Sequence, residues 1–168
     1  MAESSRRAAR PAARGGTPNA LFAVAAAERP PTELIGRADE VSVTFPWGSL
    51  LRGALALDEI AAAGLAALVG PAGRLIVITS IADRDRLELP SLEEPGAATD
   101  LAERWARIGL ELSEIRPATA DEVLSTRSTW ARRLAAGRDR PTWRLELATA
   151  SLTQQRTRLM TPGRILRR

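Results

Sequence analysis

The chain has 168 residues, of which 45% are hydrophobic and 26% are charged, and this is enough for one domain with a real core. It contains no cysteine and no histidine, which excludes disulfides, Cys/His zinc sites and nucleophiles activated by histidine. No tight cluster of Asp and Glu suggests a metal, and no apolar run is long enough to span a membrane. The N-terminus is polar and lacks the apolar stretch of a secretory signal, so we expect a cytoplasmic protein without a bound metal.

Charge is distributed unevenly along the chain, although its net value is only +4. Residues 127–168 hold 11 arginines against two acidic residues, a net charge of +9. Residues 1–126 hold 13 arginines against 18 acidic residues, a net charge of −5. A basic C-terminal quarter on a mildly acidic body indicates a polyanionic partner. The alternative is a solvated arginine-rich tail, and charge alone does not separate the two.

Helices and strands are predicted to alternate through the first half of the chain. In order, the pattern predicts a helix over 2–13, a short buried strand over 21–25, one helical turn over 33–37, a strand over 41–45 and a helix over about 50–68. The strand over 41–45 is β-branched and alternates apolar with polar residues, and it ends at Pro46-Trp47-Gly48. Ser49 is placed to cap the helix that follows.

The second half continues the alternation. The pattern predicts a turn over 70–73, a strand over 75–79, a surface loop over 82–97, a helix over 99–107 capped by Thr99, a strand over 110–115, a short helix begun by the capping signature at 119–122, another short helix from about Ser128 and a strand over 142–150. These elements predict an α/β open sheet in one domain over 1–150. Residues 151–168 form a basic C-terminal tail without a clear core pattern, for which we expect disorder.

Three segments stand out as candidates for function. They cover 26–30 after a predicted strand, 45–51 at the end of another, and 128–134 together with 138–140. In open α/β sheets, ligands bind beyond the carboxyl ends of the strands, where the first two segments lie. We therefore expect these segments to contribute to one site.

Two tryptophans of these segments, Trp47 and Trp130, are candidates for stacking against a nucleic-acid base. Enzymes that act on a base ring take it out of the stack, and aromatic stacking contributes roughly 1–3 kcal/mol per base. Arg133, Arg138 and Arg140 would then hold neighbouring phosphates. The alternatives are that Trp47 caps the core between strand and helix, and that the arginines form a solvated face.

The three segments together resemble those of the kanamycin–apramycin resistance 16S rRNA methyltransferases, which methylate N1 of adenine-1408. The resemblance runs over about 1–150 and is carried by FPWGSLLRG at 45–53 and by STWARRL at 128–134 with RDR at 138–140. It implies a Rossmann-like class I sheet that uses S-adenosyl-L-methionine (SAM). It also implies 16S rRNA of the small ribosomal subunit as the substrate, and aminoglycoside resistance as the outcome.

The resemblance also implies a role for each matching residue. The adenine of the substrate would lie between Trp47 and Trp130, with the Pro46 carbonyl region orienting it, and the arginines named above would contact the rRNA backbone. The positions implied for SAM are Ala26, Glu28, Thr44, Ser49 and Ser128. No catalytic histidine or cysteine is needed, because the SAM sulfonium is already an activated methyl donor and transfer depends mainly on alignment.

The sequence departs from the family pattern at the SAM site. It has no G-x-G turn after a strand and no acidic residue after a second strand, so it resembles a family member that lacks the first two strands of the sheet. Met1 aligns with an internal position of the family. We therefore expect the strand over 41–45 to form an exposed edge, and this chain alone to bind SAM weakly or not at all.

Two other functions stay open from the sequence. One is a non-enzymatic RNA-binding remnant that keeps the basic tryptophan–arginine face. The other is a methyltransferase with another substrate, because Trp47 and Trp130 specify stacking and not a particular adenine. The oligomeric state is left open by the sequence.

Overall fold

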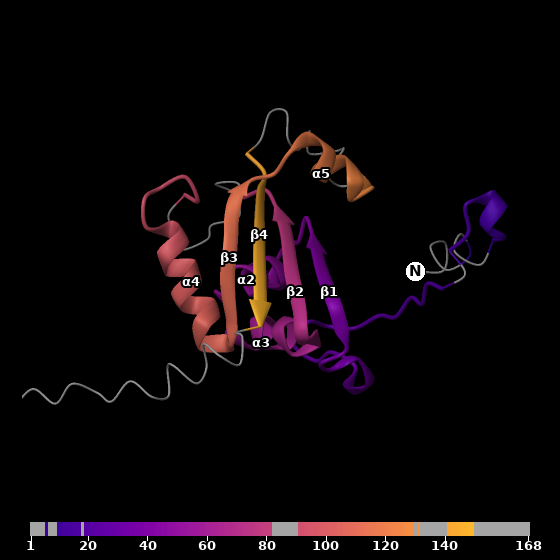
Figure 1. Cartoon of the computed structure of the whole chain (residues 1–168), viewed down its shortest axis with the longest axis horizontal. Helices are drawn as coiled ribbons and strands as arrows, with labels where there is room; N and C mark the ends of the chain where they lie inside the picture. The colour runs from indigo at the N-terminus through magenta and orange to yellow at the C-terminus, as the bar shows by residue number, and fades with distance from the viewer. Residues whose placement is uncertain are drawn as a thin grey trace, which may run out of the picture.

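The computed structural model describes residues 6, 10–17, 19–81, 91–129, 131 and 141–149. Figure 1 shows a twisted sheet with helices behind it and a long N-terminal segment that runs away from the sheet edge. The strands are β1 (Ala38–Thr44), β2 (Val69–Thr79), β3 (Leu110–Pro117) and β4 (Trp143–Thr149). The α-helices are α2 (Ser49–Ala54), α3 (Glu59–Leu68), α4 (Ala97–Ile108) and α5 (Ala120–Ser125), and short 3-10 helices span Ala12–Arg14 and Thr32–Leu34.

The strands form one mixed sheet in the order β1-β2-β4-β3. β1 pairs with β2 in parallel, and the remaining pairs are antiparallel. This confirms the α/β fold and the four strands predicted over 41–45, 75–79, 110–115 and 142–150. Within the described residues β1 pairs on one side only, so it is an edge strand, as expected.

The main core lies on the sheet face that α2, α3 and α4 cover. Leu75 and Val77 of β2 alternate onto this face beside Leu145 and Leu147 of β4, and all four are fully buried. Trp105 of α4 is also fully buried against them. Period-two alternation therefore places the apolar side chains of both strands in a single core.

The opposite face of the sheet carries a second, smaller apolar cluster near the carboxyl ends of β1 and β2. We call it the bridging cluster, and it consists of Phe45, Ile78, Val123 and Ala131. α5 contributes Val123, so this helix covers the end of this face.

One predicted strand is wrong. Residues 21–25 have no strand pairing, and their apolar side chains are largely exposed, with Leu21 at 92% and Val24 at 81%. An apolar run forms a strand only where a neighbouring backbone accepts its hydrogen bonds. Among the described residues, none pairs with this segment.

The predicted helix over 50–68 is two helices. The first helix ends with α2, and Ala56 after it adopts a positive φ of 51°. Asp58 then begins α3, because its carboxylate accepts hydrogen bonds from the backbone N–H groups of Ile60 and Ala61, both at 3.1 Å. An N-cap inside an apolar pattern resets the helix while leaving its periodicity almost intact.

Two boundaries also differ from the prediction. The turn expected over 70–73 lies inside β2, where the pairing with β1 shifts register between Ala38 and Glu40. A bulge therefore absorbs these residues without ending the strand. α4 begins after Gly96, which has a φ of 105°, and not at Thr99.

Other predictions fall partly on residues outside the described ranges. In the helix predicted over 2–13, Arg6 is helical, but Arg10 and Pro11 are not, and Ala12–Arg14 forms a 3-10 helix; the other residues of that segment are not described. The loop over 82–97 is described only from residue 91, and the tail over 151–168 lies wholly outside. Among the helices within the described residues, none is long and apolar enough to cross a membrane.

Candidate functional site

A cavity of about 760 Å³ runs along the open edge of β1. Its walls come from the segment 21–34, the strand β1, the turn that leads into the start of α2, and Leu65 and Leu68 of α3. Four of the five residues predicted to bind the cofactor line this cavity, namely Ala26, Glu28, Thr44 and Ser49. The structure therefore brings together residues from two of the three segments that the sequence singled out.

The outer wall is a tight turn packed onto α3. Ala26 and Arg29 form an isolated bridge, with the Arg29 N–H donating to the Ala26 carbonyl at 3.1 Å. The Ala27 carbonyl lies where a side chain at Gly64 of α3 would be, so only glycine permits this approach. No local pattern in the sequence predicts this contact of Gly64.

The inner wall ends in a strained turn that presents Trp47. Phe45 is buried with a positive φ of 48°, and its N–H donates to the Ile78 carbonyl at 2.7 Å. Pro46 is buried, whereas Trp47 is 77% exposed and lines the mouth of the cavity. The alternative in which Trp47 caps the core is therefore wrong.

The chemistry of the cavity lining favours an uncharged or cationic ligand with apolar surface. It holds one carboxylate, from Glu28, and the hydroxyls of Ser42, Thr44 and Ser49. No basic side chain is among the lining residues. Within the described part of the chain, no three His, Cys, Asp or Glu side chains gather to hold a metal.

The third segment is approached through α5. Its start is the capping box that the sequence predicted: Thr119 Oγ1 accepts from the Glu122 N–H at 3.2 Å, and the Glu122 carboxylate accepts from the Thr119 N–H at 2.8 Å. Ser128 then begins the next helical turn, since its Oγ accepts from the Ala131 N–H at 3.2 Å. Ser128 does not line the cavity at β1. The remaining predicted site residues, Trp130, Arg133, Arg138 and Arg140, lie outside the described residues.

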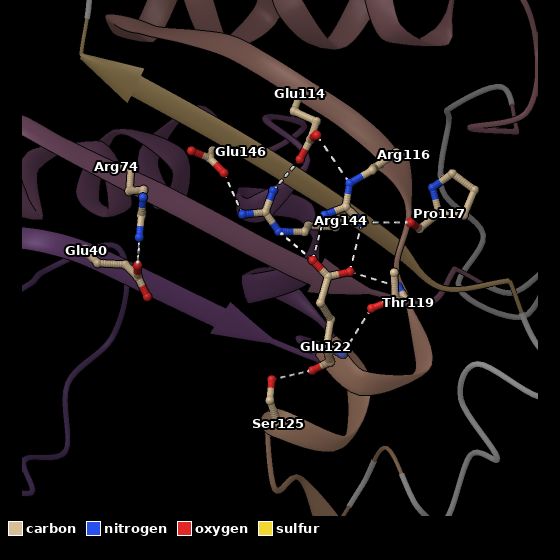
Figure 2. A network of polar contacts seen from close by, with 10 residues as sticks. All are labelled: Glu40, Arg74, Glu114, Arg116, Pro117, Thr119, Glu122, Ser125, Arg144 and Glu146. Atoms are coloured by element: carbon tan, nitrogen blue, oxygen red, sulfur yellow. Dashed lines mark hydrogen bonds and ion pairs between the residues drawn. The ribbon is translucent and has the colours of Figure 1, made fainter.

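A network of ion pairs ties α5 to the sheet, as Figure 2 shows. The Glu122 carboxylate accepts from both terminal nitrogens of Arg116 on β3, at 2.6 and 2.8 Å, and lies 3.3 Å from Nε of Arg144 on β4. Arg144 also pairs with Glu114 and Glu146, and its side chain is only 13% exposed. Hydrogen bonds from Arg116 and from the Thr119 backbone lower the pKa of Glu122 to about 2.

Sequence reasoning missed this network. The local pattern identifies Glu122 only as the N3 residue of a capping box, and the pattern of β4 identifies only its apolar residues. The alternation itself contained a signal, because Arg144 falls on the face opposite Leu145 and therefore away from the main core. Glu146, two residues away, lies on the same face of β4, but the other partners, Glu114 of β3 and Glu122 of α5, are distant in the chain and no local pattern predicts them.

The bridging cluster brings two of the predicted segments close together. Phe45 precedes the Pro46-Trp47 turn, and Ala131 belongs to the segment that begins at Ser128. Both side chains pack in this cluster with Val123 of α5 and Ile78 of β2. The carboxyl end of β1 and the segment 128–131 thus share one small core.

Comparisons with known proteins agree with this arrangement. The model of the family NpmA: 16S rRNA (adenine(1408)-N(1))-methyltransferase matches residues 1–149. A 16S rRNA (adenine(1408)-N(1))-methyltransferase of Streptoalloteichus hindustanus is 39% identical over 146 residues, which cover 83% of this chain and 66% of that relative. An Escherichia coli enzyme of the same description is 30% identical over 139 residues, covering 79% of this chain and 64% of that relative.

Solved structures give the same result. A 16S rRNA (adenine(1408)-N(1))-methyltransferase variant from Catenulisporales acidiphilia, crystallised with the cosubstrate SAM, superposes with a TM-score of 0.74 at 31% identity, over 90% of this chain and 71% of that one. The 16S rRNA methyltransferase KamB superposes with a TM-score of 0.72 at 34% identity, over 89% and 72% of the two chains. The chain spans slightly less than two thirds of the length of the curated relatives named here. It belongs to the 16S rRNA (adenine(1408)-N(1))-methyltransferase family.

Proposed function

We propose that this chain functions in a cytoplasmic SAM-dependent methyltransferase that modifies N1 of an adenine in 16S rRNA of the small ribosomal subunit. We propose further that this modification gives aminoglycoside resistance. One observation carries the proposal: an exposed tryptophan, Trp47, is among the residues that line the cavity beside β1. A cofactor site that opens beside an aromatic platform is what methyl transfer to a base requires.

The residues of the cavity fit SAM. The volume lies within the roughly 300–1,000 Å³ of small-molecule sites, and apolar walls such as Val41 and Leu65 suit a purine ring. The lining carries one carboxylate and no basic side chain, so a sulfonium cation meets no repulsion there. When bound, SAM would supply an activated methyl group.

Each residue then has a defined part in holding the reactants. Ala26 and Glu28, on the turn against α3, would border the adenine end of SAM. Thr44 and Ser49 would line its methionine and methyl side, with Ser128 approaching from the third segment. This assignment uses both walls of the cavity.

The target base would be held by stacking and by backbone groups. Trp47, exposed at the mouth, would form one wall for the flipped adenine and Trp130 the other, while the Pro46 carbonyl region orients the ring. Arg133, Arg138 and Arg140 would contact neighbouring phosphates, each a charge-assisted contact that salt weakens. Alignment of N1 with the methyl group is the main contribution of the protein to the rate.

The test is methyl transfer from labelled SAM to purified small ribosomal subunits, with the modified position read by primer extension. It is run on this chain and on a chimera in which this chain replaces the matching part of the Streptoalloteichus hindustanus relative. In the active form, Trp47→Ala should lower transfer by roughly tenfold or more, the effect of losing one stacked base. Ile60→Ala, which removes an exposed apolar side chain of α3 outside the cavity, is the matched control. Equal activity of the two variants would contradict the stacking role of Trp47.

The RNA-binding remnant is the second candidate, and the net charge of +9 over residues 127–168 favours it. Binding to small subunits without methyl transfer, in both the chain and the chimera, would support it over the enzyme. Methyl transfer at a nucleotide other than adenine-1408 would instead indicate another substrate.

A further inference from the structure

The distance between the Trp47 turn and the segment 128–131 depends on residues outside the candidate site. The bridging cluster joins Phe45, two residues before Trp47, to Ala131, one residue after Trp130. Val123 of α5 packs in the same cluster. The spacing of the two segments therefore depends on where α5 lies on the sheet.

α5 is a helix of only six residues, and one side chain holds it from two strands. Glu122 binds Arg116 of β3 through two hydrogen bonds and Arg144 of β4 through an ion pair at 3.3 Å. Figure 2 shows its carboxylate between both guanidinium groups and the backbone of Thr119. A short helix with few apolar contacts gains its position from such pairs more than a long one does.

The position of α5 is passed on to the third segment through consecutive hydrogen bonds. Thr126 Oγ1 donates to the Val123 carbonyl at 2.7 Å and accepts from the Ser128 N–H at 3.2 Å. Ser128 Oγ accepts in turn from the Ala131 N–H. Arg127, between these residues, has a positive φ of 51°, a conformation that persists only where its surroundings fix it.

We propose that Glu122 is a positioning residue that sets the spacing between the Trp47 turn and the segment 128–131. Glu122 holds α5 against β3 and β4. The position of α5 in turn fixes the bridging cluster and the turn at Thr126. This inference rests on the proposed function in one respect only, which is that a flipped base lies between the two segments. The spacing itself is a property of this chain and can be measured without substrate.

The absence of cysteine from the chain makes a distance measurement direct. Spin labels on Arg52→Cys in α2 and Thr129→Cys, two exposed positions, report the separation of the two segments by pulsed electron paramagnetic resonance. The otherwise unaltered pair should give one narrow distance distribution. Glu122→Gln, which removes the charge that binds two guanidinium groups, should broaden or shift it.

Two further variants make the result decisive. Glu103→Gln removes an exposed carboxylate from α4 and should leave the distribution narrow, so it controls for the loss of one charge. Arg116→Gln removes the same contact from the β3 side and should broaden the distribution as Glu122→Gln does, which keeps the test valid if one variant folds poorly. Distributions as narrow in Glu122→Gln and Arg116→Gln as in Glu103→Gln would overturn the proposal.

A functional readout separates this proposal from the proposed function. In the chimera, Glu122→Gln should raise the apparent KM for small subunits roughly tenfold, as misplacement of a positioning group does. It should weaken SAM binding less, because Ser128 is the one SAM candidate on the segment that Glu122 positions. An equal loss of SAM affinity would count against positioning of the base side. If the spin-label distances change but rRNA binding and methylation do not, Glu122 still positions the segments and the stacking role in the proposed function fails.

Discussion

The outer wall of the cavity and the α5 side of the candidate site are held by different kinds of contact. The segment 21–31 reaches the rest of the molecule through the close approach of Ala27 to Gly64, and its apolar residues Leu21 and Val24 are exposed. The α5 side is fixed by the pairs of Glu122 with Arg116 and Arg144 and by the bridging cluster. The outer wall relies on backbone fit at a single glycine, and the α5 side on charge pairs from two strands.

This difference indicates which side of the candidate site, the SAM side or the rRNA side, is already formed in this chain before a ligand binds. Exposed apolar residues return little free energy for the conformational entropy lost when the segment is ordered, so the SAM-side wall should have low local stability. The α5 side has satisfied charges and a small apolar core, so it should be largely formed before rRNA binds. The predictions that follow test this contrast.

The largest effect is expected for SAM itself. This chain alone should show no saturable SAM binding below about 1 mM, a deficit of about 4 kcal/mol against a micromolar site. The reason is that the outer wall is weakly held and the sequence has no G-x-G turn to approach the methionine moiety. Isothermal titration calorimetry measures this, with the chimera as the positive control. A micromolar Kd for the chain alone would remove the contrast between the outer wall and the α5 side.

A single methyl group should detach the outer wall. In Gly64→Ala the new Cβ meets the Ala27 carbonyl, and such overpacking costs about 1–3 kcal/mol. Amide exchange at Arg29, whose N–H bonds to Ala26, should accelerate while exchange in β4 is unaffected. Ala63→Ser, an exposed change one residue away on the same helix, is the control. Identical exchange of Arg29 in both variants would show that the turn does not depend on this contact.

Glu122→Gln should destabilise the α5 side of the candidate site, by a smaller amount. Because the pair with Arg116 is partly exposed, screening limits the loss in the free energy of unfolding to about 1 kcal/mol. Urea denaturation of the variant beside Glu103→Gln measures it. A loss no greater than that of Glu103→Gln would mean that the network contributes geometry without stability.

The smallest effect is the pH dependence of the stability that Glu122 contributes to the α5 side. The folded-state pKa of Glu122 is about 2, below its ordinary value of 4.5, so its contribution is complete above pH 4.5 and is lost as the pH falls toward 2. The difference in unfolding free energy between the unaltered chain and Glu122→Gln should therefore be constant from pH 7 to 5 and then shrink. A difference that persists at pH 2 would assign the stability to packing and not to the charge.

Local patterns predicted much of the fold because they depend on neighbours in the chain. The alternation over 41–45 and 142–150 defines which side chains of β1 and β4 face the core. The spacing of Thr119 and Glu122 fixes the start of α5, since a capping box is satisfied within four residues. The segments 26–30 and 45–51 were recognisable from the sequence, and three cofactor candidates within them, Ala26, Glu28 and Ser49, line one cavity together with Thr44.

The sequence by itself thus determined the strands, most helix positions and the residue types of the site. Only the tertiary structure decided that 21–25 stays unpaired, because a strand exists only with a partner backbone. Only it decided that the pattern over 50–68 breaks at Asp58, since the alternative hydrogen bonds of a cap leave the apolar spacing unchanged. The second role of Glu122 likewise emerged only in three dimensions, because its partners on β3 and β4 are brought to it by strand pairing and not by proximity in the chain.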